Sequence, residues 1–255
     1  MRIGIIGGNG FLGSEIYRVL SGKFDVSIID RENYRIYQKT WFDVLINSNG
    51  NSKRYIANSY PIWDFNESVL STYNSIIDFN FGKYIYISSS DVYTYVDSKE
   101  SEPINPTFLK PYGFNKYISE LGILRYCRNY LILRCSAIVG NNLKKGVIFD
   151  YINNRSLHVS PNSKLQFISN TEIAKIILFF IETPGNDIFN VGGIDQISVG
   201  EFLSDAKYKE KPKLQNYRMN IDKLRFKYSG LKLSRDYVEE VLCQNGPHHT
   251  THSIH

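Results

Sequence analysis

The chain has 255 residues, 42% of them hydrophobic, which is enough to bury the core of one large domain or of a main domain with a small attached lobe. Its 30 basic and 25 acidic residues leave a net charge of +5, and the excess is spread along the chain rather than gathered into runs. This pattern argues against a nucleic-acid partner. The three cysteines lack CxxC spacing, which argues against a disulfide framework and against a metal site.

The first apolar run, residues 2–6, is too short for a signal peptide and is broken at once by glycines. No stretch approaches the roughly 18 apolar residues that suggest a membrane span. We therefore expect a soluble, cytoplasmic protein without a membrane partner. The last residues, 245–255, form a polar, histidine-rich tail that we expect to be disordered.

Short apolar runs alternate with helical patterns from the N-terminus onward, which is typical of a parallel sheet covered by helices. The predicted fold class is α/β. In chain order, the predicted strands are residues 2–6, 25–29, 43–46, 83–88, 130–133 and 187–191. The predicted helices are residues 13–21, 67–79, 112–128 and 171–181.

A glycine-rich turn, Gly7 to Gly13, joins the first predicted strand to the first predicted helix and can be read as GxGxxG or as GxxGxxG. Glycines at these places permit a tight turn, bring backbone amides against a pyrophosphate and let the helix pack closely on the strand. The helix N-terminus then faces the negative charge. The turn therefore predicts a dinucleotide cofactor.

The second predicted strand is followed by Asp30, where a carboxylate can accept hydrogen bonds from an adenosine ribose. A carboxylate there repels a 2′-phosphate, so NAD is the expected cofactor. The next residue, Arg31, could pair with such a phosphate, which leaves NADP open.

Serines end the strand predicted at 83–88, with Ser89 and Ser90 directly after it. Open α/β sheets place their ligands at the carboxyl ends of the strands. A serine hydroxyl there can donate a hydrogen bond to a substrate oxygen, although serines at a strand end are also ordinary turn formers.

Tyr112 and Lys116 stand four residues apart at the start of a predicted helix, which places them on one face. A free phenol has a pKa of about 10 and is a poor base at neutral pH, but an adjacent ammonium stabilises the phenolate. Tyr112 could then exchange a proton with a sugar hydroxyl or carbonyl while a nicotinamide exchanges the hydride.

The regular alternation loosens after Gly140. We expect residues 1–140 and 164–193 to form a Rossmann domain, and residues 141–163 and 194–244 to form a smaller lobe that closes over the ligand. Candidate substrate contacts in or beside this lobe are Asn142, Arg155, Lys164, Tyr217, Arg218, Lys223 and Arg225.

Together these segments resemble the extended short-chain dehydrogenase/reductase family, also called the NAD-dependent epimerase/dehydratase family. The resemblance is carried, in family order, by residues 7–13, 89–93, 112–116 with Glu120, 133–134, 167–174 and 189–192. It implies a doubly wound Rossmann sheet with a small C-terminal substrate-binding lobe, and a nucleotide-activated sugar as substrate. It also implies a homodimer formed by the 67–79 and 112–128 helices.

The resemblance implies a role for each catalytic residue: Ser89 orients the substrate oxygen, Tyr112 is the acid/base, and Lys116 tunes Tyr112 and binds the nicotinamide ribose. The implied cofactor contacts are Gly7, Gly10, Phe11, Leu12, Gly13, Asp30, Arg31, Asn47, Ser48, Tyr112 and Lys116. No metal is implied.

Two departures from the family pattern narrow the function. Only residues 31–42 fill a gap where the family usually has a further strand and helix, so the adenine pocket must be trimmed. Sugar-nucleotide dehydratases carry two acidic residues after the catalytic hydroxyl, whereas here Ser90 takes the first place and only Asp91 remains. This disfavours dehydration and leaves 4-keto reduction or epimerisation, as in polysaccharide biosynthesis. The alternative is a non-catalytic dinucleotide-binding sensor or assembly subunit.

Overall fold

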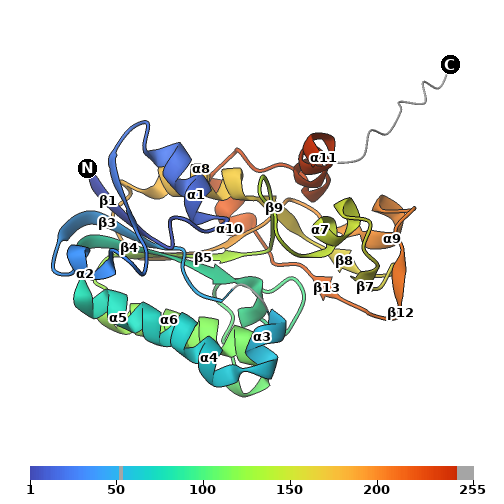
Figure 1. Ribbon diagram of the computed structural model, residues 1–255, viewed down its shortest axis with the longest axis horizontal. Coiled ribbons are helices and arrows are strands. Elements are labelled where there is room, and N and C mark those ends of the chain that lie inside the picture. The colour runs from blue at the N-terminus through green and yellow to red at the C-terminus, as the bar shows by residue number, and fades with distance from the viewer. Residues whose placement is uncertain (52–53, 246–255) are drawn as a thin grey trace.

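The computed structural model describes residues 1–51 and 54–245, and its main feature is a six-stranded parallel sheet (Figure 1). The predicted α/β class is confirmed. The strand order is β10-β5-β4-β3-β1-β2. The strands are β1 (Arg2–Ile6), β2 (Asp25–Ile29), β3 (Trp41–Asn47), β4 (Asn80–Ser89), β5 (Tyr130–Cys135) and β10 (Asp187–Val191).

Helices cover both faces of this sheet. Helices α1 (Gly13–Leu20) and α8 (Asn170–Phe180) lie on one face, and α5 (Ser71–Asp78) and α6 (Pro111–Tyr126) on the other (Figure 1). Strand β4 shows why two cores form, because its side chains alternate between the faces. Ile85 and Ile87 join the core under α1 and α8, whereas Tyr84 and Tyr86 join the core under α5 and α6.

Strand β2 is the outermost strand on its side of the sheet. Between β2 and β3 the chain forms only the short helix α2 (Tyr34–Tyr37). The shortened connection expected from the sequence therefore leaves this edge of the sheet without a further strand.

The helical region before β4 differs from the prediction of one helix over 67–79. Helix α3 (Arg54–Ser59) and helix α4 (Pro61–Phe65) come first, followed by the π-helix η1 (Asn66–Leu70) and then α5. Proline suits the first turn of a helix but disfavours helical backbone in the residue before it, so α3 ends ahead of Pro61.

Small sheets and short helices make up the C-terminal part (Figure 1). Strand β8 (Lys164–Leu165) pairs with β11 (Ile197–Ser198) and β13 (Asn216–Tyr217). The other pairs are β7 (Leu157–Val159) with β12 (Tyr208–Lys213), and β6 (Ala137–Val139) with β9 (Phe167–Ser169). The helices are α7 (Val147–Ile152), α9 (Val199–Phe202), α10 (Asp222–Lys227) and α11 (Ser234–Asn245).

Two expectations concern the chain termini and membranes. The tail predicted to be disordered lies, from residue 246 on, outside the described residues. Within residues 1–51 and 54–245, no helix has both the length and the apolar character that crossing a bilayer requires.

Candidate active site

The glycine turn packs the start of α1 directly against the end of β1. Gly7 has a positive φ of 76° and its amide donates to the Ile29 carbonyl at 3.0 Å. A Cβ on Gly13 would lie 2.2 Å from the Gly7 carbonyl oxygen, so only glycine permits this approach. Gly10 donates to the same carbonyl at 2.9 Å, and the Phe11 carbonyl accepts from Asn170 at 3.4 Å.

Leu12 ends the turn with its side chain in the core under α1, 8% exposed. Its side chain therefore packs inward, which leaves its backbone as the part that can face a ligand.

Asp30 lies beside the glycine turn. One carboxylate oxygen accepts from the Asn9 side chain at 2.9 Å, and the other accepts from the amides of Glu32 and Asn33. Arg31 extends from the same end of β2 to Glu67 in the π-helix, with a nitrogen-to-oxygen distance of 2.6 Å. This ion pair links the sheet edge to the helices that precede β4.

Asn47 and Ser48, both expected to contact the cofactor, are engaged in bonds within the protein. Asn47 is 1% exposed and donates to the Tyr84 hydroxyl at 2.8 Å. The Ser48 hydroxyl donates to the Ile6 carbonyl at 2.8 Å. Both Ser48 and Asn49 lie against the glycine turn: Ser48 Oγ is 2.8 Å from where a Gly13 Cβ would be, and the Asn49 Cα is 3.1 Å from where a Gly7 Cβ would be.

Ser89 ends β4, and the first turns of α6, which carry Tyr112 and Lys116, pack against this end of the strand. A Cβ on Gly113 would lie 2.0 Å from the Asp91 carbonyl oxygen, so the first turn of α6 packs against the 3₁₀ turn η2 (Ser90–Val92). The Lys116 ammonium donates to the Ile87 carbonyl at 2.9 Å and lies 4.9 Å from the Tyr86 ring centroid.

Lys116 lowers the pKa of Tyr112, the direction that the sequence predicts, but other influences outweigh it. Burial is the largest influence and raises the pKa of Tyr112; Lys116 lowers it, Asp91 raises it and Arg54 lowers it, and the net direction is upward. Burial alone would lower the pKa of Lys116, but Tyr86 and Tyr112 outweigh it and the pKa is raised. Lys116 is thus a stable cation beside a phenol that keeps its proton.

A buried polar network supports this end of the site. Glu120, fully buried, accepts from the Ser88 hydroxyl at 2.5 Å and pairs with Arg134 at 2.6 Å. Arg134 also donates to the Tyr93 hydroxyl at 2.6 Å, which in turn donates to Asn190 at 2.8 Å. Tyr93, which follows the serine strand end, is therefore a packed structural residue.

A cluster of charged and aromatic side chains that the sequence did not suggest lies beside Tyr112. Arg54, at the start of α3, pairs with Asp91 at 2.5 Å, and its guanidinium carbon lies 4.9 Å from the Tyr217 ring centroid. Asp91 and Tyr217 were each visible in the sequence, but nothing local to Arg54 signals that it joins them.

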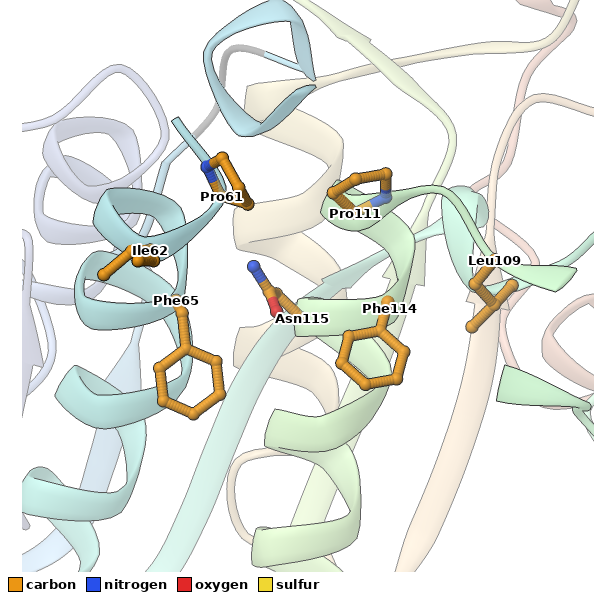
Figure 2. Close-up of a pocket in the computed structure, with 7 residues that line it drawn as sticks. All are labelled: Pro61, Ile62, Phe65, Leu109, Pro111, Phe114 and Asn115. Atoms are coloured by element: carbon orange, nitrogen blue, oxygen red, sulfur yellow. The ribbon is translucent and has the colours of Figure 1, made fainter. Parts of the chain in front are cut away.

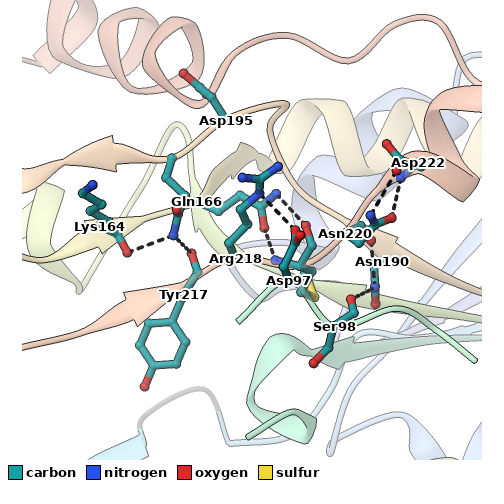
Figure 3. Close-up of polar contacts among 12 residues, drawn as sticks. Asp97, Ser98, Lys164, Gln166, Asn190, Asp195, Tyr217, Arg218, Asn220 and Asp222 are labelled. Carbon is teal, nitrogen blue, oxygen red and sulfur yellow. Dashed lines mark hydrogen bonds and ion pairs between the residues drawn. The ribbon is translucent and has the colours of Figure 1, made fainter. Parts of the chain in front are cut away.

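Polar contacts near this cluster join β10 to the segments around Ser98 and Asn220 (Figure 3). The Asn190 amide donates to the carbonyls of Ser98 and Asn220, both at 2.9 Å. Arg218 pairs with Asp97 at 3.2 Å. Among the other residues predicted to contact the substrate, Lys223 pairs with Asp187, the first residue of β10. Lys223 therefore does not face Tyr112.

The site contains features that fit a bound dinucleotide. Ser68 Oγ is buried and finds no hydrogen-bond partner among the described residues. A Cβ on Gly50 would lie 3.5 Å from Ser68 Oγ and 3.6 Å from Lys116 Nζ, so all three groups border one space. An unpaired buried hydroxyl beside an ammonium suits a ligand that carries hydroxyl groups.

Several solved structures share this fold at low sequence identity. UDP-N-acetylglucosamine 4-epimerase from Methanobrevibacter ruminantium M1, in complex with UDP-N-acetylmuramic acid, is 21% identical, with a TM-score of 0.78 and 96% of each chain covered. The dTDP-4-dehydrorhamnose reductase from Bacillus anthracis, in complex with NADP, is 16% identical, with a TM-score of 0.75 and coverage of 95% of this chain and 98% of the other.

A third similar structure is the enzyme WbmG from Bordetella bronchiseptica in complex with NAD and UDP. It is 16% identical, with a TM-score of 0.76 and coverage of 95% of this chain and 94% of the other. No curated protein sequence matches the chain. The model of the NAD-dependent epimerase/dehydratase family matches residues 42–192, more than half of the chain. The chain therefore belongs to the NAD-dependent epimerase/dehydratase family.

Proposed function

We propose that this protein is an NAD(P)-dependent enzyme that modifies a nucleotide-activated sugar by hydride transfer at a sugar carbon, in a 4-keto reduction or an epimerisation. The observation that carries the proposal is the meeting of Ser89, Tyr112 and Lys116 at the carboxyl end of β4. Family membership and the nucleotide-sugar epimerases and reductases among the similar structures support it.

The proposed cofactor is NAD, with NADP as the alternative, and when bound it supplies or accepts the hydride. The glycine turn would hold its pyrophosphate, Asp30 its adenosine ribose, and Lys116 with Ser68 its nicotinamide ribose. The similar structures that contain NAD or NADP support this assignment.

The proposed roles of the three residues follow from their chemistry. Ser89 orients the substrate oxygen through its hydroxyl, Tyr112 exchanges a proton with that oxygen, and Lys116 stabilises the phenolate that remains. Because burial raises the pKa of Tyr112, the phenol holds its proton at neutral pH. The protonated form serves the reductive direction, in which a ketone oxygen takes a proton as it becomes a hydroxyl, and the phenolate serves the oxidative direction.

The test is cofactor absorbance with a panel of UDP-, dTDP-, GDP- and CDP-linked 4-keto sugars, repeated with Tyr112→Phe. We expect turnover with at least one nucleotide sugar that disappears in the variant. Turnover that survives the substitution would overturn the proposed role of Tyr112. Cofactor binding without turnover on any panel member would support the alternative, a dinucleotide-binding sensor or assembly subunit.

The pH dependence separates the two directions of reaction. Tyr112 is protonated below its raised pKa, so the rate of ketone reduction should stay level across neutral pH and fall only above about pH 10. The rate of alcohol oxidation should rise with pH over the same range, because it needs the phenolate. Initial rates of ketone reduction and of alcohol oxidation, each measured against pH, check this expectation. A rate of ketone reduction that rises with pH would contradict it.

We also propose that the protein is a homodimer formed through α5 and α6. These helices, α4 and the π-helix η1 expose a series of large apolar side chains: Ile62, Trp63, Phe65, Leu70, Ile77, Phe114, Leu121, Leu124 and Tyr126. Pro61, Ile62 and Phe65 face Leu109, Pro111 and Phe114 across an apolar groove of about 440 Å³ (Figure 2). A contiguous apolar surface of this kind marks an interaction site.

Light scattering after size exclusion tests the dimer. Leu124→Glu should convert it to a monomer, because a charge would be buried at the contact. Phe226→Glu is the matched control, since Phe226 is an exposed apolar residue on α10, which lies on the other side of the sheet (Figure 1). A monomeric wild-type protein would overturn the proposal.

A further inference from the structure

Arg54 is connected to the candidate catalytic serine through a single carboxylate oxygen. Its Nε lies 2.5 Å from Asp91 Oδ2, and the same oxygen accepts from the Ser89 hydroxyl at 3.3 Å. Asp91 is itself held in place, because its amide donates to Ser89 Oγ at 3.2 Å. The guanidinium therefore borders the catalytic cluster, while the Arg54 side chain as a whole remains 41% exposed to solvent.

Tyr217 holds Arg54 from the lobe. Its backbone carbonyl accepts from the Gln166 amide at 3.1 Å and from the Gln196 side chain at 3.0 Å, which fixes β13. The ring points away from these bonds (Figure 3), and the Arg54 guanidinium carbon lies 4.9 Å from its centroid. A cation at this distance from an aromatic ring is attracted to it.

A buried carboxylate fastens α4, and with it α3, to the helix that carries Tyr112. Asp64 is fully buried and accepts from Asn51 at 2.7 Å and from Asn115 at 2.6 Å. Asn115 lies on α6 between Tyr112 and Lys116. These bonds tie three segments together one helical turn from Tyr112, so Arg54 does not depend on a free loop for its place.

We propose that Arg54 is a positioning residue of the catalytic centre: held by Asp91 and Tyr217, it forms with Asp91 a charge pair beside Ser89 and the first turn of α6 that controls proton exchange at Tyr112. This inference rests on the proposed function, because it assigns a role around the same acid/base.

The charged and titratable groups around Tyr112 come from four elements. Lys116 on α6 and Arg54 on α3 lower the pKa of Tyr112, whereas Asp91 on η2 and Tyr86 on β4 raise it, and burial raises it most. Arg54 and Asp91 therefore act on the pKa of Tyr112 in opposite directions. When one of the two charges is removed, nothing compensates the effect of the other.

An alternative role for Arg54 is to bind an anionic group of the substrate. Asp91 pairs with Arg54 Nε at 2.5 Å, so an anion bound at the other guanidinium nitrogens would lie beside a carboxylate that repels it. The geometry therefore points to a charge pair rather than to a vacant anion site. The two roles predict different kinetics, which makes them separable.

The experiment measures alcohol oxidation against pH for Arg54→Gln, Asp91→Asn and the double variant. Below the pKa of Tyr112, this rate follows the phenolate fraction, so the charge that each single variant leaves unpaired should change the rate. Arg54→Gln should lower the rate about tenfold at fixed pH, and Asp91→Asn should raise it about tenfold. The double variant should return to within about threefold of the wild-type rate, because both charges are gone.

Arg54→Lys keeps the charge and should rescue most of the rate that Arg54→Gln loses. A higher KM in Arg54→Gln with an unchanged pH profile would overturn the proposal in favour of anion binding. Equal losses in both single variants at every pH would overturn it in favour of a purely structural bridge.

A readout without substrate separates this inference from the proposed function. Tyrosinate absorbance during an alkaline titration, taken as the difference between each protein and its Tyr112→Phe counterpart, reports Tyr112 directly. Asp91→Asn should titrate at lower pH than wild type, and Arg54→Gln at higher pH. If these shifts occur in a protein that turns over no nucleotide sugar, the charge pair stands and the proposed function fails. Identical titrations in all variants would overturn the charge pair.

Discussion

The two ends of the candidate site are built in opposite ways. At the catalytic end, around Ser89, Tyr112 and Lys116, the supporting ion pair Glu120–Arg134 has side chains that are 0% and 4% exposed. At the edge end, beside β2, the ion pair Glu67–Arg31 has side chains that are 26% and 85% exposed. A buried pair is costly to break, whereas an exposed pair contributes little to stability. The catalytic end is therefore rigid, and the edge end can adapt to its ligand.

The sharpest test of the catalytic end is Tyr112→Phe, which removes only the proton-exchanging oxygen. We expect kcat to fall by about 10²–10⁴-fold, the range typical of a lost general acid or base. Cofactor affinity, measured by fluorescence titration, should change by less than about threefold because the ring remains. A variant that retains more than about a tenth of wild-type kcat would contradict the assignment.

The next largest effect should come from breaking the buried pair. Glu120→Gln leaves the Arg134 charge buried without its counter-charge, and we expect a loss of about 3–5 kcal/mol in the free energy of unfolding. Urea denaturation measures this. Glu239→Gln removes a carboxylate that is 53% exposed and paired with Arg235 at 3.9 Å. If Glu239→Gln lowers the free energy of unfolding as much as Glu120→Gln does, the contrast between buried and exposed ion pairs does not hold.

A smaller effect should follow from widening the contact between α6 and η2. Gly113→Ala places a methyl group 2.0 Å from the Asp91 carbonyl oxygen, so the helix must shift, at a cost of about 1–3 kcal/mol. The shift should also lower kcat, because Tyr112 is the adjacent residue. Gly22→Ala is the matched control, since its Cβ meets nothing within 4 Å. Full activity in Gly113→Ala would mean that α6 can shift against η2 without loss of function. The catalytic end would then not be rigid.

The smallest effect is expected at the edge end. Arg31→Ala should change the free energy of unfolding by no more than about 1 kcal/mol, because the pair it breaks is exposed. The same change should weaken NADP several-fold and leave NAD almost unaffected, since a guanidinium pairs with a 2′-phosphate. Arg35→Ala, at another exposed position, is the control. Equal losses for both cofactors would remove Arg31 from the adaptable end of the site.

The sequence was most informative where a residue's role depends on near neighbours. Strands β1, β2 and β10 have the predicted bounds, because each is a short apolar run with turn or polar residues after it. The proximity of Tyr112 to Lys116 follows from helical spacing, and that of Ser89 from its place at a strand end.

What the sequence did not disclose depends on distant contacts. Arg54 becomes part of the site only through Asp91 and Tyr217, which belong to other elements. Whether the pKa of Tyr112 is raised or lowered depends on its burial. The sequence spacing between Tyr112 and Lys116 does not reveal that burial. The segment before η1 lacked an apolar period of 3.6 residues, so α3 and α4 were missed.

The π-helix η1 also sets the angle at which the preceding helix leaves it. A π-helical turn contains one residue more than the α-helical turn it replaces. Deleting one residue from 66–70 would let the segment relax to an α-helix and rotate α4 by about 100° about its axis. Asp64 would then turn away from Asn115, and the bond that joins α4 to α6 would be lost. The one extra residue of this turn therefore fixes the direction in which the buried carboxylate of Asp64 faces the helix that carries Tyr112.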